Sequence, residues 1–130
     1  MKHMFQPLGS SLCGQTCVAM IAGVSIEESI AAFGGTRGGT RTRQLVDALH
    51  KLGIRCGEPP LIRIDGDCFI SDTCIVKLHF EWTKRTHWVV WHEGRYYDPS
   101  EYGHMLLLKP NNYEYAEGVR STSYLPIYLP

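Results

Sequence analysis

The chain has 130 residues, of which 44% are hydrophobic, and this is enough for a single domain with one ordinary core. Its formal net charge is zero, and Arg37, Arg41 and Arg43 are interspersed with threonine and glycine, so we expect no nucleic-acid-binding surface. The first residues reach Gln6-Pro7 without an apolar run, so we expect neither a signal peptide nor a membrane segment. We therefore expect a cytoplasmic location.

The first part of the chain carries the signals of two helices. Residues 13–22 form an apolar run that predicts a buried helix, and Gly23 is suited to end it. Ser25 and Glu28 have the spacing of a capping box, which predicts a second helix running through Phe33.

A third helix is predicted after a glycine-rich loop at 34–39. Thr40 is placed to cap this helix, and Gly53 is placed to end it. One stripe of the helix is apolar and consists of Leu45, Val46, Leu49 and Leu52.

Strand and turn signals follow the helices. Residues 74–80 alternate between apolar and polar side chains, which predicts a half-buried strand with Val76, Leu78 and Phe80 on one face. Turn residues at 65–67 precede this strand, and a tyrosine-rich tail from 106 to 130 contains a possible last strand at 121–128. Helices followed by an antiparallel sheet predict one α+β domain spanning residues 1–130.

A tight hairpin is predicted where 87–92 and 95–98 flank Glu93-Gly94. A two-residue turn there pairs His92 with Arg95, and counting back makes His87 and Asp98 diagonal neighbours on one face. A carboxylate in that position can fix the tautomer of an imidazole and stabilise the imidazolium. His87 is therefore a candidate general base, and Asp98 is the candidate residue that orients it.

Cys13 is the candidate nucleophile. The first turn of a helix and a nearby histidine both lower the pKa of a thiol. Small residues before Cys13, and Gly14 after it, would let a substrate backbone approach the sulfur. Free backbone N–H groups at the helix start, with the amide of Gln6, could bind an oxyanion. Trp88 is a candidate for the wall of the substrate groove.

The number of cysteines predicts that the thiols are reduced. The chain has five cysteines, at positions 13, 17, 56, 68 and 74. An odd number without an export signal argues against a disulfide framework. No Cys-x-x-Cys pair is present, so we expect no structural zinc and no other metal or cofactor.

The chain resembles the bacteriocin-processing peptidases that act on double-glycine leaders, which belong to the papain-like cysteine peptidase superfamily. The resemblance covers residues 6–100 and rests on Gln6, CGQTCVAM at 13–20, GTRTRQLVDALHKLGI at 39–54, HWVV at 87–90 and YYDP at 96–99. It implies a papain-like fold in which Cys13 is the nucleophile, His87 the base and Asp98 the orienting acid. It also implies that Gln6 belongs to the oxyanion hole.

Two positions differ from the pattern of that family. Gln6 lies seven residues before Cys13, where the family usually has six, and Leu12 replaces an acidic residue that often precedes the cysteine. These peptidase domains are commonly fused to a transporter, and we expect no membrane segment here. Leader processing during export is therefore not implied.

The functional hypothesis is a thiol hydrolase acting on a peptide or isopeptide bond through a thioester, with a peptide or protein as its substrate. The same residues also serve deamidases, transglutaminases and acyltransferases, and a papain-like module could simply bind a peptide or protein without catalysis. Structural explanations also stay open, since Cys13 could be a buried thiol and Asp98 a turn residue. The paired glycines at 34–35 and 38–39 indicate a flexible loop rather than a self-cleavage site.

Overall fold

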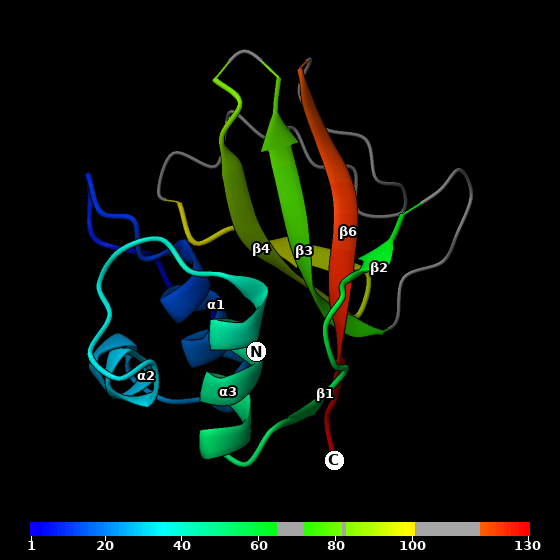
Figure 1. Cartoon of the computed structure of the whole chain (residues 1–130). Helices are drawn as coiled ribbons and strands as arrows, with labels where there is room; N and C mark the ends of the chain where they lie inside the picture. The colour runs from blue at the N-terminus through cyan, green and yellow to red at the C-terminus, as the bar shows by residue number, and fades with distance from the viewer. Residues whose placement is uncertain (65–71, 82, 101–117) are drawn as a thin grey trace.

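The computed structural model describes residues 1–64, 72–81, 83–100 and 118–130. Within these residues, three helices come first in the chain and six strands follow (Figure 1). All strand pairs are antiparallel, and the helices gather on one side of the sheet. The predicted α+β architecture is therefore confirmed.

The first two helices have the predicted boundaries to within one residue. Helix α1 spans Cys13–Ala22, and Gly23 ends it in the left-handed conformation with φ of 69°. Helix α2 spans Ile26–Ala32. Its capping box is present, because the Glu28 N–H donates to Ser25 Oγ at 3.0 Å and the Ser25 N–H donates to Glu28 Oε1 at 3.4 Å.

Helix α3 spans Thr42–Lys51, and its predicted cap is wrong. The capping position is Arg41, whose backbone N–H donates to Gln44 Oε1 at 2.7 Å. The Thr40 hydroxyl is instead buried and has no hydrogen-bond partner within the described residues. The predicted apolar stripe is correct, because Leu45, Val46 and Leu49 are fully buried, and Leu52, just after the helix, is partly buried against the same core.

The strands form a sheet in the order β1, β6, β3, β4, β5, and β2 pairs with β6 outside this path. Their bounds are Arg55–Cys56 for β1, Ile62–Arg63 for β2, Thr73–Phe80 for β3, Thr86–His92 for β4, Arg95–Tyr97 for β5 and Val119–Tyr128 for β6. The predicted last strand thus begins two residues earlier than expected. The predicted turn at 65–67, Cys68 and the tail between 106 and 117 lie outside the described residues.

Strand β3 is more buried than the sequence predicted. It lies between β4 and β6 at the centre of the sheet, and Cys74, Ile75 and Val76 are all fully buried. Ile75 joins the core beneath the helices, whereas Val76 joins a second apolar cluster with Val89. A half-buried strand was the wrong expectation, because both faces of this strand are covered along its first half.

The hairpin between β4 and β5 has the predicted register. Glu93 and Gly94 both have positive φ, at 48° and 80°, as a two-residue type I′ turn requires. His92 pairs with Arg95, and Trp91 pairs with Tyr96. Strand β5 ends at Tyr97, so Asp98 lies immediately beyond the last paired residue.

In the part of the chain that the structure describes, no helix combines the length and apolar character needed to cross a membrane. The longest helices there, α1 and α3, have 10 residues each. A helix needs about 20 residues to span a bilayer.

Candidate active site

Three candidate residues meet where α1 packs beside β4 (Figure 1). Cys13 is the first residue of α1, His87 is the second residue of β4, and Asp98 follows β5. The helix start supplies the thiol and the hairpin supplies the other two groups. The structure therefore brings together residues from distant parts of the chain.

His87 and Asp98 form a short, shielded hydrogen bond. His87 Nε2 lies 2.8 Å from Asp98 Oδ1, and the two side chains are only 12% and 7% exposed. The backbone N–H of Ser100 also donates to Asp98 Oδ1, at 2.8 Å. This second bond holds the carboxylate in place, so the imidazole has one preferred orientation.

The N-terminal segment anchors the backbone that carries Asp98. His3 Nε2 lies 2.7 Å from the carbonyl oxygen of Asp98, and the Gln6 N–H donates to the Pro99 carbonyl at 2.7 Å. The ring of His3 also contacts Tyr97, with the centroids 5.5 Å apart. Sequence reasoning did not identify His3, because no local pattern indicates this distant contact.

Cys13 and His87 lie close enough to change the pKa of each other's side chain. Burial alone would raise the pKa of the Cys13 thiol, but the hydrogen bond and charge of His87, with backbone N–H groups of Trp88 and Gly14, lower it below 9.0. Burial would lower the pKa of His87, whereas hydrogen bonds to Asp98 and Cys13 raise it to about 9. Both shifts favour the charged forms, a thiolate beside an imidazolium, over the neutral thiol and imidazole. Because Asp98 occupies Nε2, the ring nitrogen left for Cys13 is Nδ1.

Cys17 and Cys56 have environments that are unfavourable for a nucleophile. Burial, followed by the negative charges of Cys13 and Asp98, raises the pKa of Cys17 well above 9.0. Cys56 Sγ lies 3.8 Å from His50 Nε2, yet burial and the Glu58 charge raise its pKa to about 11. A neighbouring histidine is therefore not sufficient by itself to lower the pKa of a cysteine thiol. Cys13 differs from Cys56 because its histidine is held and charged by a buried carboxylate.

A pocket of about 580 Å³ gives access to the candidate nucleophile and base. Its lining combines the start of α1 with the turn between β3 and β4, and consists of Gln6, Ser10, Ser11, Cys13, Gly39, Phe80, Lys84, Arg85, Thr86 and His87. A substrate carbonyl in this pocket could therefore reach the sulfur and the imidazole together.

Gln6, the predicted oxyanion-hole residue, lines this pocket with Cys13. Its Nε2 donates to the Ser10 carbonyl oxygen at 2.8 Å and lies 3.4 Å from Ser10 Oγ. The closer bond fixes the amide group near the thiol. An amide nitrogen carries two hydrogens. The hydrogen that points to the more distant Ser10 hydroxyl could instead be donated to a substrate oxygen.

Gly14 and Trp88, the predicted substrate contacts, are both buried. A Cβ atom at Gly14 would collide with Thr40 Oγ1 and lie 3.3 Å from Leu45 Cδ2, so glycine allows α1 to pack closely on this segment. Trp88 is 4% exposed in the core, and its Nε1 donates to the Thr40 carbonyl at 3.4 Å. Successive side chains of a strand point to opposite faces, which explains why Trp88 enters the core while His87 lines the pocket.

Gln15 supports the pocket from within the core and was not identified from the sequence. It is fully buried, and its Nε2 donates to the carbonyls of Thr36 at 2.9 Å and Gly38 at 3.0 Å. These bonds position the loop that brings Gly39 to the pocket. A polar amide within an otherwise apolar helical run was the available signal.

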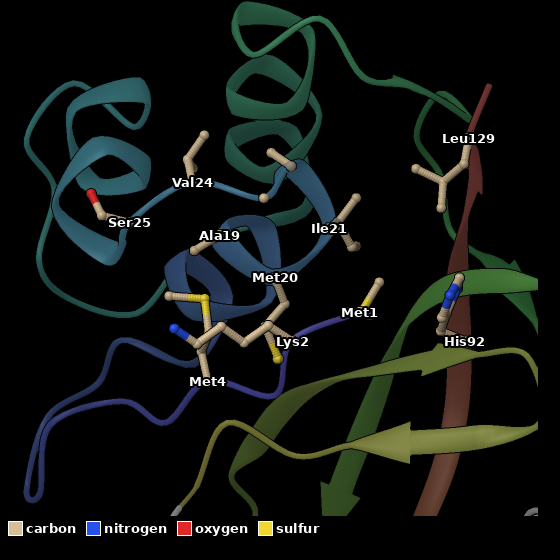
Figure 2. Close-up of a pocket in the computed structure, with 12 residues that line it drawn as sticks. Met1, Lys2, Met4, Ala19, Met20, Ile21, Val24, Ser25, His92 and Leu129 are labelled. Carbon is tan, nitrogen blue, oxygen red and sulfur yellow. The ribbon is translucent and has the colours of Figure 1, made fainter.

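A larger pocket, of about 650 Å³, lies at the other end of α1 (Figure 2). Met1, Met4 and Met20 contribute apolar surface to it, and its described lining contains neither a cysteine nor a carboxylate. His92 borders this pocket, but its Nδ1 lies 2.8 Å from Thr73 Oγ1. Of these two pockets, the smaller one therefore contains the candidate nucleophile.

Scans against family models, curated proteins and solved structures find no match for this chain. Within the described residues, no group of three histidine, cysteine or acidic side chains could hold a metal ion. The arrangement of Cys13, His87 and Asp98 is therefore the feature that bears on function.

Proposed function

We propose that the chain is a papain-like thiol hydrolase that cleaves a peptide or isopeptide bond through a thioester at Cys13. The observation that carries this proposal is the His87–Asp98 hydrogen bond beside Cys13, at a pocket that substrate can enter and that both Cys13 and His87 line. The chain order of these residues, with the cysteine opening a helix and the other two on a later hairpin, supports a papain-like arrangement.

The first half of the reaction transfers the acyl group to sulfur. The Cys13 thiolate attacks the carbonyl carbon, a C–S bond forms, and the negative charge moves to the carbonyl oxygen. Gln6 and the backbone N–H groups at the start of α1 would stabilise that oxyanion. The His87 imidazolium then gives its proton to the departing amine as the C–N bond breaks, and a thioester remains.

The second half returns the enzyme to its starting state. Neutral His87 takes a proton from water, and the resulting hydroxide attacks the thioester carbonyl. The C–S bond then breaks, which releases a carboxylic acid product and regenerates the thiolate beside an imidazolium. Asp98 accepts the hydrogen bond of His87 and stabilises the charged imidazole. A free thiolate persists in a reducing compartment, so the proposal includes a cytoplasmic location.

The proposal is tested by incubating a peptide library and folded protein substrates with the wild-type chain, Cys13→Ala and Cys56→Ala. Cys56 is a suitable control because it is a free thiol beside a histidine outside the pocket. New peptide termini and released ammonia are measured by mass spectrometry and by a coupled assay. We expect cleavage by the wild type and by Cys56→Ala, and none by Cys13→Ala.

Three other outcomes would assign a different nucleophile or a different function. Cleavage that persists in Cys13→Ala at the wild-type rate would exclude Cys13 as the nucleophile. Ammonia release without cleavage would identify a deamidase, because the acyl group would then come from a side-chain amide. If the Cys13→Ala protein retained the full biological effect of the wild type, the chain would act as a binding module and not as an enzyme.

A further inference from the structure

One wall of the Cys13 pocket carries two neighbouring cations. Lys84 and Arg85 both line the pocket, and they belong to the turn that connects β3 with β4. Backbone hydrogen bonds fix this turn, because the Lys84 N–H donates to the Phe80 carbonyl and the Phe80 N–H donates to the Arg85 carbonyl, each at 2.9 Å. The two charges are therefore attached to an ordered part of the pocket wall.

Neither cation is neutralised within the described residues. Arg37, Arg43 and Arg120 all lie within 4.0 Å of a carboxylate oxygen, whereas Lys84 and Arg85 have no such partner there. Glu81 belongs to the same turn but does not line the pocket, and its Oε1 lies 3.8 Å from Arg120 Nε. No carboxylate is among the described residues that line the pocket.

The charges of the reacting groups do not cancel those of the turn. Thiolate and imidazolium carry opposite charges, so their sum is zero. Asp98 adds one negative charge, but its side chain is 7% exposed and hydrogen-bonded to His87. Lys84 and Arg85 together add two positive charges at the pocket surface. Counted over the described residues, the part of the pocket that substrate meets is therefore net positive.

We infer that Lys84 and Arg85 select substrates that carry a carboxylate close to the scissile carbonyl. An arginine fork and a lysine ammonium both bind carboxylates by charge-assisted hydrogen bonds. The ring of Phe80 lines the same wall and offers apolar surface to the carbon atoms beside that carboxylate. The carboxylate could belong to an acidic side chain or to a free C-terminus. The substrate preference rests on the proposed hydrolase activity, whereas the anion preference of the pocket can be measured without turnover.

The first experiment compares the alkylation of Cys13 by anionic iodoacetate and neutral iodoacetamide. The ratio of the two rate constants cancels any change in the thiol itself. The wild type is compared with Lys84→Gln/Arg85→Gln and with Lys51→Gln/Arg63→Gln, which removes two exposed cations outside the pocket. We expect the iodoacetate-to-iodoacetamide ratio to fall about three- to tenfold in the pocket variant only, and less at high salt. Equal ratios in all three proteins would overturn the anion preference.

The second experiment uses matched peptide substrates. One pair has Glu or Gln beside the scissile bond, and the other has a free or amidated C-terminus. We expect kcat/KM to be about tenfold higher for one of the charged members, and this preference to disappear in Lys84→Gln/Arg85→Gln. The pair that shows the difference identifies the source of the carboxylate.

The two experiments separate failure of this inference from failure of the proposed function. Cleavage of both members of each pair at equal rates would overturn the carboxylate preference and leave the hydrolase intact. If no peptide is cleaved while the alkylation ratio still depends on Lys84 and Arg85, the hydrolase proposal fails and the anion preference stands.

Discussion

His87 Nε2 lies 2.8 Å from Asp98 Oδ1, although 11 positions separate the two residues in the chain. The type I′ turn at Glu93-Gly94 sets the register of the hairpin and so determines which residue comes beside His87. Asp98 follows the last paired residue of β5, where its carboxylate is free to turn toward the imidazole and to accept the N–H of Ser100. The candidate base and its candidate orienting acid thus belong to one local unit, and α1 places Cys13 beside them.

Asp98→Asn should shift the alkaline limit of activity. Burial would lower the pKa of His87, while Asp98 and Cys13 raise it to about 9. His87 must be protonated to release the amine. Wild-type kcat/KM should therefore fall as pH rises through about 9. Without the carboxylate charge the fall should begin at lower pH, and kcat/KM near pH 8 should drop about a hundredfold. The measurement is kcat/KM against pH.

The matched control for that experiment is Asp47→Asn. Asp47 is an exposed carboxylate on α3, 3.9 Å from Arg43 Nη1, and lies outside the pocket. Its pH profile should match that of the wild type. An unchanged alkaline limit in Asp98→Asn would show that Asp98 does not control the charge of His87.

Gln6→Ala should distinguish a donor to the oxyanion from a structural support. If Gln6 stabilises the oxyanion, kcat should fall about 10²- to 10³-fold with little change in KM. Gln6 also holds the Ser10 carbonyl at 2.8 Å, so a loss of stability is expected as well. Steady-state kinetics and thermal unfolding are measured on the same variant. A lower melting temperature with an unchanged kcat would leave Gln6 with the structural role alone.

Local sequence signals predicted much of the fold and the core of the candidate site. The bounds of α1, the capping box of α2 and the register of the β4–β5 hairpin each depend on residues close together in the chain. These are the elements that place Cys13, His87 and Asp98. The resemblance to bacteriocin-processing peptidases suggested the same three residues, and their activity is still a prediction.

Features that depend on distant packing could not be predicted in the same way. The alternation within β3 predicts a half-buried strand, because the two clusters that cover its faces come from distant parts of the chain. The Thr40 hydroxyl was expected to cap α3, but it lies against Gly14 at the start of α1. Whether Trp88 faces the core or the pocket depends on which face of β4 the helices cover. The cations at 84–85 reach the pocket only through the fold of the turn between β3 and β4.

Gly14→Ala should destabilise the protein. The added methyl group would collide with Thr40 Oγ1, and α1 packs too closely on this segment for a simple adjustment. We expect the free energy of unfolding to fall by about 1–3 kcal/mol, despite the better helix propensity of alanine. Adding Thr40→Ala should restore part of this loss, because it removes the hydroxyl. Chemical denaturation measures both effects.

Gly38→Ala is the control for the added methyl group, because a Cβ atom there meets nothing within 4 Å and the φ angle of Gly38 is not positive. It should change the free energy of unfolding by less than Gly14→Ala. A Gly14→Ala protein as stable as the wild type would mean that the contact between α1 and Thr40 is looser than the structure indicates.

The pH dependence of Cys13 alkylation tests the central claim most directly. Iodoacetamide modification of each cysteine is followed by mass spectrometry in the wild type and in His87→Ala, without any need for a substrate. In the wild type, Cys13 should react as a thiolate with a pKa below 9.0 and faster than Cys17 or Cys56, whose pKa values are raised. In His87→Ala, burial should dominate and move the Cys13 pKa above 9.0. Equal, slow labelling of all cysteines, or the same Cys13 profile in both proteins, would contradict a nucleophile activated by His87.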